Sequence, residues 1–190
     1  FETPIGPVSI DTAADEDGTS TATFTSVEPS VSPIDHAVLT ALLGLIGVDS
    51  SALDARYPAM LSYAGNTHPI VVLRDQSTFD EFTFDPSAMR PLMAAQEWAG
   101  TVTILHPLDD NTFEARNLFP VGNIVEDPAT GSAAASTGGY LRKLEPAATP
   151  RRITIHQGRH GGRPSVLEVD IPVDGGISVT GTAVPVVDGQ

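Results

Sequence analysis

The sequence contains no cysteine. Disulfide bridges, thiolate metal sites and a thiol nucleophile are therefore excluded for this chain. Basic residues are also scarce, because 10 Lys and Arg stand against 24 Asp and Glu, which gives a formal net charge of -14. Nucleic acid and anionic membranes would repel such a chain, so neither is an expected partner.

Long apolar runs are missing as well. The longest, residues 37–48, is too short to span a bilayer and has helical spacing. No positively charged leader is present, so the sequence predicts a cytoplasmic protein. Hydrophobic residues make up 41% of the 190 and charged residues 18%, a composition that can form a packed core. The acidic cluster at residues 15–17 lacks calcium-loop spacing, and we expect no metal site.

Strand and helix patterns alternate along the chain and predict an α+β fold. Residues 1–11 and 21–27 predict a strand pair, and Ser32 before Pro33 predicts a helix start. Further helices are predicted at residues 86–97 and from Asp127 to about Leu144. Further strands are predicted at residues 59–64, 69–73, 101–106, 113–119, 152–156, 165–171 and 177–186.

The stretch Glu126-Asp127-Pro128-Ala129-Thr130-Gly131-Ser132 predicts the start of the central helix. Asp127 is a favourable N-cap, and Pro128 suits the first helical turn. Capping does not require Gly131 and Ser132 one turn later, followed by alanines and glycines. A helix this poor in bulk is either tightly packed or lets another group approach its backbone. Its free N–H groups and hydroxyl, at the positive end of the helix dipole, form a candidate cradle for a carboxylate or phosphate.

His68 follows Gly65-Asn66-Thr67 and precedes the apolar run of residues 69–73. A polar residue is expected at such a turn without any functional reason. A histidine there can also line a ligand site. Both interpretations stay open at this point.

Residues 126–133, preceded by residues 115–120 and followed by Gln157-Gly158 and residues 162–165, resemble the C-terminal part of the phenazine-biosynthesis PhzF-like family. That family shares the diaminopimelate-epimerase fold. The resemblance therefore implies a mainly antiparallel sheet wrapped around a central helix, the one that begins at Asp127. It implies residues 1–30 as a strand pair from the end of an N-terminal domain, residues 31–180 as the C-terminal domain, and residues 181–190 as a closing strand returning toward the N-terminal domain.

The resemblance also implies a cofactor-independent isomerase that transfers a proton on a small carboxylate substrate. Asp127 matches the family's catalytic aspartate, which contacts polar groups of the substrate, and Gly131 and Ser132 match the helix start that receives a carboxylate. Thr130 and His68 complete the expected substrate-binding set. Epimerases of this fold use a pair of cysteines, so the acid and base here must be other groups.

In the family, a catalytic glutamate and a Gly-His-Ala-Thr motif precede the matched part, and neither occurs in this sequence. The resemblance thus implies half of an active site, inactive alone. The expected partner is the N-terminal half as a separate chain or fragment, or a second copy in a homodimer. Two alternatives remain open: a non-catalytic small-anion-binding protein with the same cradle, and a purely structural protein of the same fold.

Overall fold

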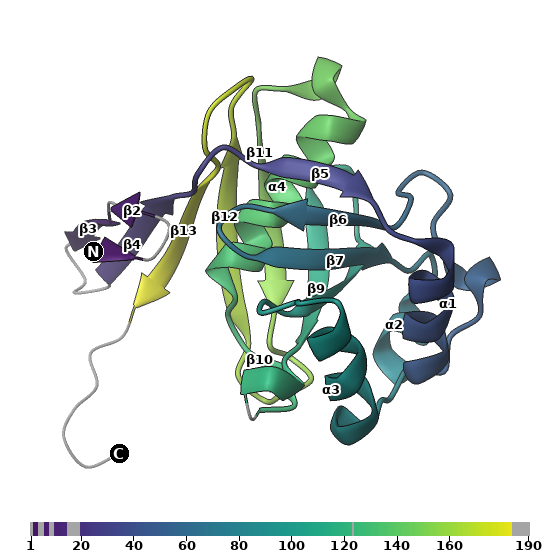
Figure 1. Cartoon of the computed structure of the whole chain (residues 1–190). Helices are drawn as coiled ribbons and strands as arrows, with labels where there is room; N and C mark the ends of the chain where they lie inside the picture. Colours follow the sequence, from purple (N-terminus) through teal and green to yellow (C-terminus); the bar gives the residue numbers. More distant parts are fainter. Residues whose placement is uncertain (1, 4–5, 8–9, 15–19, 123, 184–190) are drawn as a thin grey trace, which may run out of the picture.

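A helix inside a strongly curved sheet is the main feature of the molecule (Figure 1). The computed structural model describes residues 2–3, 6–7, 10–14, 20–122 and 124–183. The helix is α4 (Gly131–Leu144), and residues 133–141 of it are buried. Strands from both halves of the sheet, among them β5, β6, β7, β12 and β13, contact it. The sheet therefore wraps α4 from two sides.

The sheet runs in the order β3-β4-β13-β12-β11-β9-β8-β7-β6-β5, and β10 pairs with β9 beside this path. Neighbours are antiparallel except for β7–β8 and β9–β11, which are parallel. The strands of this sheet are β3 (Ile10–Ala14), β4 (Ser20–Thr25), β5 (Ser30–Pro33), β6 (Met60–Tyr63), β7 (Thr67–Val72), β8 (Val102–Pro107), β9 (Thr112–Leu118), β10 (Glu126–Asp127), β11 (Arg151–Gln157), β12 (Ser165–Ile171) and β13 (Ser178–Ala183). A separate short pair joins β1 (Glu2–Thr3) to β2 (Gly6–Pro7). The predicted α+β class with a mainly antiparallel sheet around a central helix is confirmed.

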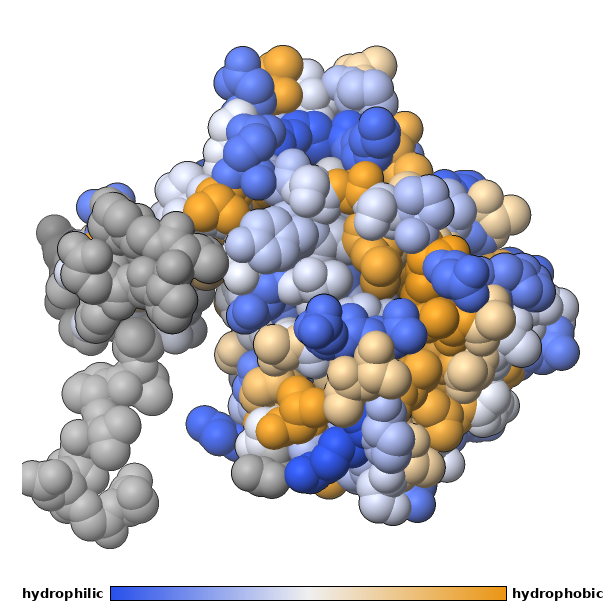
Figure 2. Space-filling model, in the orientation of Figure 1, coloured by the Kyte–Doolittle hydropathy of each residue, from blue (hydrophilic) through white to orange (hydrophobic). Residues whose placement is uncertain are grey.

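Two apolar cores lie on the two faces of the central strands. Side chains alternate along a strand, so Ile70 and Val72 of β7 pack toward α4, whereas Val71 packs on the other face. That second face is covered by α1 (His36–Leu45), α2 (Gln76–Glu81) and α3 (Pro86–Ala95). Much of the apolar surface on the face drawn in Figure 2 lies on the side of α1 and α3.

The small residues of α4 are explained largely by tight packing. A Cβ atom at Gly138 would lie 2.7 Å from Ile177 Cγ2. A Cβ atom at Gly139 would lie 2.5 Å from Cβ of Pro29. Because the sheet encloses the helix from both sides, glycine is needed where side chains of the surrounding segments lie directly against the helix backbone.

Two predicted helix starts are wrong. Ser30–Pro33 forms β5, and α1 begins after Asp35, whose carboxylate accepts the backbone N–H of Ala37 at 2.8 Å. Asp127 lies in β10 rather than at an N-cap, and α4 begins after Thr130. In both cases pairing with another strand extends the chain and delays the helix, which local capping preferences cannot reveal.

The N-terminal strand pair has the predicted second strand, but its first strand has other bounds and the pair has a further neighbour. Ile10–Ala14, rather than residues 1–11, pairs with β4, and β4 pairs on its other side with β13 over six residues. The pair of β3 and β4 is thus continuous with the curved sheet, from which it projects in Figure 1. Most of the predicted closing segment, residues 184–190, lies outside the described residues. The predicted assignment of these parts to a separate domain stays a prediction.

Candidate functional site

Segments far apart in the sequence meet at the N-terminus of α4. Asp127 comes from β10, Gln157 from the end of β11, and His68 from β7. Pairing of β10 with β9 places Asp127 opposite Asn117, and Asn117 is also opposite Thr103 of β8. The sheet therefore fixes the position of the helix start relative to these side chains.

The turn before α4 is held by a closed set of hydrogen bonds. The Thr130 hydroxyl donates to Asp127 Oδ2 at 2.7 Å. Gln157 Nε2 donates to the Asp127 carbonyl at 2.6 Å and to Thr130 Oγ1 at 2.9 Å, and Gln157 Oε1 accepts the Thr130 backbone N–H at 3.2 Å. Gln157 thus caps the helix from another strand and satisfies an N–H group that would otherwise be unpaired. Among the described residues, no hydrogen bond reaches the other carboxylate oxygen, Asp127 Oδ1.

Gly131 is required by an aromatic ring. A Cβ atom at this position would lie 2.7 Å from Phe24 Cε1. Phe24 belongs to β4, so the strand pair β3–β4 at the end of the sheet supplies an apolar neighbour for the helix start. The absence of a side chain at Gly131 therefore makes room for the Phe24 ring against the helix backbone.

Ser132 is the end of a buried polar chain. His68 Nε2 lies 3.1 Å from Ser132 Oγ, and His68 Nδ1 lies 3.0 Å from the Thr101 carbonyl and 3.1 Å from Thr101 Oγ1. The hydroxyls of Thr101 and Thr103 both donate to Asn117 Oδ1, at 2.8 and 2.7 Å. Asn117, the strand partner of Asp127, is therefore linked through Thr101 to the histidine that contacts Ser132.

His68 is fully buried in a strand rather than placed at a turn. Its burial disfavours the charged form and lowers the pKa of His68 to about 4. The imidazole is consequently neutral at neutral pH. It reaches the helix start only through Ser132, which is itself partly exposed.

This burial makes the stability of the protein sensitive to acid. Between pH 6.5 and about 4 the unfolded chain binds a proton at His68 that the native protein does not, so the free energy of unfolding falls as the pH falls through this window. The expected loss is about 3 kcal/mol. Urea unfolding at a series of pH values should show this slope, and His68→Gln should flatten it. The exposed His36→Gln is the control, and an equal slope in all three proteins would contradict the prediction.

An ion pair buried beside the site anchors β10. Arg116 Nη2 lies 2.6 Å from Glu126 Oε1, and Arg116 Nη1 donates to the carbonyls of Phe79 and Phe82 at 3.1 and 3.0 Å. The guanidinium also stacks on the Phe82 ring, 3.7 Å from its centroid. Because Glu126 directly precedes Asp127, this pair fixes the strand from which Asp127 projects.

The connection between β11 and β12 closes over the turn before α4. Arg159 in this connection pairs with Glu114 at 3.0 Å and with Asp80 of α2 at 2.5 Å. Ser165 at the start of β12 donates to the Pro128 carbonyl at 2.7 Å. The connection is therefore tied both to the sheet surface and to the site.

Gly158 in this connection is the position most sensitive to substitution. It has φ +83, and a Cβ atom there would clash with the Arg163 carbonyl and lie 2.7 Å from that of Pro128. We expect Gly158→Ala to lower the free energy of unfolding by about 1 to 3 kcal/mol. Gly162→Ala is the matched control, because Gly162 has φ +70 but no atom within 4 Å of the added Cβ. Equal losses in the two variants, measured by urea unfolding, would show that crowding has no effect.

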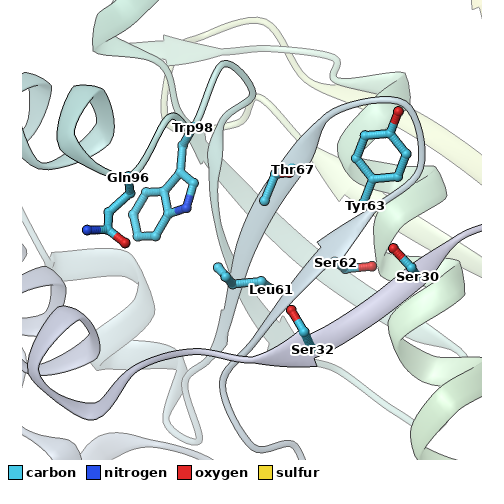
Figure 3. Close-up of a pocket in the computed structure, with 8 residues that line it drawn as sticks. All are labelled: Ser30, Ser32, Leu61, Ser62, Tyr63, Thr67, Gln96 and Trp98. Atoms are coloured by element: carbon cyan, nitrogen blue, oxygen red, sulfur yellow. The ribbon is translucent and has the colours of Figure 1, made fainter. Parts of the chain in front are cut away.

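A separate pocket of about 410 Å³ opens on the other face of β6 and β7, between these strands and the end of α3 (Figure 3). Leu61, Tyr63 and Thr67 point to this face because strand side chains alternate, and Ser62 Oγ points toward α4. Trp98 is buried at the edge of this pocket. Its described lining contains no carboxylate, histidine, lysine or arginine, so the start of α4 is the better candidate for acid/base chemistry.

The structure brings all five residues predicted for the site, Asp127, Thr130, Gly131, Ser132 and His68, to the start of α4. Thr130 is buried, and its hydroxyl is used by Asp127 and Gln157. The sequence did not indicate Thr101 or Asn117, because neither stands in a recognisable motif. Gln157 formed part of the resemblance but had no predicted role.

Comparison with known proteins agrees with this fold. The family model of the phenazine biosynthesis-like proteins (PhzC-PhzF) matches residues 1–189 of the chain. The chain belongs to this family.

Several of its relatives in sequence are named uncharacterized isomerases. One from Bacillus subtilis is 27% identical over 181 residues, which cover 90% of this chain and 60% of that protein. One from Mesorhizobium japonicum is 36% identical over 86 residues, covering 43% of this chain and 28% of that protein.

Solved structures share the fold at low identity. A PhzF-family phenazine biosynthesis protein of Bacillus anthracis has a TM-score of 0.73 at 19% identity, over 97% of this chain and 65% of that one. A predicted epimerase of Pseudomonas aeruginosa has a TM-score of 0.74 at 21% identity, over 95% and 64%. The chain thus spans less than two thirds of the length of these relatives. In its described part, each helix is too short or too polar to cross a membrane.

Proposed function

We propose that the chain forms the anion-binding part of a cofactor-independent isomerase, which moves a proton on a small carboxylate substrate. One observation carries the proposal: Asp127 and Ser132 stand together at the N-terminus of α4 in a protein of the PhzF family. The names of the relatives from Mesorhizobium japonicum and Bacillus subtilis, both uncharacterized isomerases, support the reaction class.

In this proposal the substrate carboxylate is held by the helix start. Backbone N–H groups at the first turn of α4 lack intrahelical partners, and the helix dipole favours negative charge there. The Ser132 hydroxyl adds a further donor. Phe24, packed on Gly131, gives the carbon skeleton of the substrate an apolar neighbour.

Asp127 is the proposed acid/base group of this chain. Its Oδ2 is held by the Thr130 hydroxyl at 2.7 Å, which orients the carboxylate and leaves Oδ1 toward the substrate. A carboxylate in hydrogen-bond reach of the transferred hydrogen can take a proton from carbon or hold a substrate ammonium group. Thr130 and Gln157 support this orientation without touching the substrate.

Proton transfer to carbon leaves a signature that tests the proposal without knowledge of the product. The purified native protein is incubated in D₂O with a panel of small carboxylic acids, and deuterium at carbon is followed by ¹H NMR. Carboxylate-dependent incorporation that is lost in Asp127→Asn supports the isomerase. Shifts of the Ser132 and Ala133 amide signals without any exchange would instead support the non-catalytic anion-binding alternative. If neither deuterium exchange nor signal shifts are observed, both the isomerase and the anion-binding function are contradicted.

A further inference from the structure

We propose that His68 is a positioning residue, which donates a hydrogen bond to Ser132 and thereby directs the Ser132 hydroxyl proton toward a bound carboxylate. This inference rests on the proposed function and assigns to His68 a role behind the ligand site. The motivation is the contact between Nε2 and Ser132 Oγ at 3.1 Å, made by a ring that has no exposure of its own.

The atoms around Nδ1 determine which ring nitrogen carries the proton. The Thr101 backbone N–H points at Nδ1 at 3.1 Å, and Nδ1 is its hydrogen-bond acceptor among the described residues. The carbonyl of Thr101, at 3.0 Å, competes for the same nitrogen as an acceptor. A buried N–H is left unpaired more rarely than a carbonyl, which tolerates incomplete pairing. The N–H therefore takes the Nδ1 lone pair, and the ring proton resides on Nε2.

The Thr101 hydroxyl gives its proton to Asn117 Oδ1 at 2.8 Å, so it is not a donor to Nδ1. Its oxygen, 3.1 Å from Nδ1, is a second acceptor beside the carbonyl, and both oxygens can lack a donor at this nitrogen more readily than the buried N–H can lack an acceptor. Asn117 also accepts the hydroxyl of Thr103, which fixes the amide orientation. The ring itself lies flat against Gly100, where a Cβ atom would come within 2.6 Å of His68 Cε1. The ring is thus held in one place and one orientation.

The direction of the Ser132 hydroxyl follows from this tautomer. With Nε2–H donating, Ser132 Oγ accepts from His68 and its own proton is left to point away from the ring. At the first turn of α4 that proton joins the free N–H groups as a donor for an anion. The opposite tautomer would draw the Ser132 proton to Nε2 and turn oxygen lone pairs toward the ligand, which repels a carboxylate.

The tautomer is measured directly on the unmodified protein labelled with ¹⁵N-histidine, by long-range ¹H–¹⁵N correlation at pH 7. His68 signals are assigned by their loss in His68→Gln. We expect a protonated Nε2 and an unprotonated Nδ1, with the Nε2 signal shifting in Ser132→Ala. A protonated Nδ1 would overturn the inference whether or not any carboxylate binds.

Binding of benzoate, a simple carboxylate probe, tests the consequence. His68→Leu removes the donor, and we expect it to weaken benzoate binding roughly ten- to a hundredfold, as a lost hydrogen bond to a charged ligand does. Ser132→Ala should weaken it by a similar factor, and the double variant should add little. His68→Gln, whose amide N–H can replace Nε2–H, should restore most of the affinity.

The outcomes separate this inference from the proposed function. Equal affinity in His68→Leu and the unmodified protein, or equal weakness in His68→Gln and His68→Leu, would overturn the positioning role. Failure of the unmodified protein to bind benzoate, with the Nε2–H tautomer observed, would count against the carboxylate cradle in the proposed function. The tautomer is read on the unmodified protein, with a folded His68→Gln needed only for the assignment of the signals, and it decides the inference even if His68→Leu does not fold.

Discussion

Replacement of Arg116 by alanine is expected to lower the free energy of unfolding by about 3 to 5 kcal/mol. Arg116 and Glu126 are both largely buried and pair at 2.6 Å. Removal of the arginine leaves the Glu126 carboxylate in an apolar surrounding, and it also frees the carbonyls of Phe79 and Phe82 from their donor. The cost of an uncompensated buried charge dominates the loss, with the missing hydrogen bonds adding to it.

Arg152 provides the matched control for this experiment. It pairs with Asp170 across β11 and β12 at 2.6 Å, as close as Arg116 to Glu126, but its side chain is 63% exposed. Water screens such a pair, so Arg152→Ala should cost no more than about 1 kcal/mol. Urea unfolding of both variants measures the difference. If Arg116→Ala loses no more stability than Arg152→Ala, burial is not what makes the first pair important.

Replacement of Asp127 by asparagine is expected to lower the rate of substrate deuteration by roughly 10²- to 10⁴-fold, the usual contribution of a general acid or base. Asparagine keeps an oxygen that accepts the Thr130 hydroxyl, and the Asp127 backbone carbonyl still accepts from Gln157. The turn before α4 should therefore survive while the ability to exchange a proton is lost. The rate is measured by ¹H NMR in D₂O, and the fold by circular dichroism and urea unfolding.

Asp110→Asn is a suitable control because Asp110 is an exposed carboxylate in the turn between β8 and β9. It should leave both rate and stability unchanged. Unfolding of Asp127→Asn would assign a structural role to the aspartate. A folded Asp127→Asn with the rate of the unmodified protein would remove Asp127 from the mechanism.

Local patterns in the sequence determined much of the fold. The alternation in residues 165–171 predicted β12 with the bounds observed, and the helical pattern after the central motif predicted the end of α4 at Leu144. Pro86 likewise marked the first residue of α3. These elements are set by side-chain periodicity and by proline, which act within a few residues and can be read without knowledge of the tertiary structure.

The start of α4 could not be located in this way. Asp127 and Pro128 have the residue types of a helix start, but β9 pairs with Glu126 and Asp127, and Arg116 holds Glu126 in place. The helix begins only after Thr130, where Gln157 accepts the first free N–H. A capping preference of about 1 kcal/mol is too small to oppose a strand pairing and a buried ion pair.

The sequence by itself determined the family, because the residues around Asp127, Thr130, Gly131 and Ser132 are contiguous and their types are specific. Only the tertiary structure decided which buried side chains support these residues. His68, Thr101 and Asn117 are separated from Ser132 and from one another in the chain, and the curved sheet brings them into one buried polar chain. Such contacts are made by long-range packing and strand register, and a buried polar residue has no periodicity that would reveal its partner in advance.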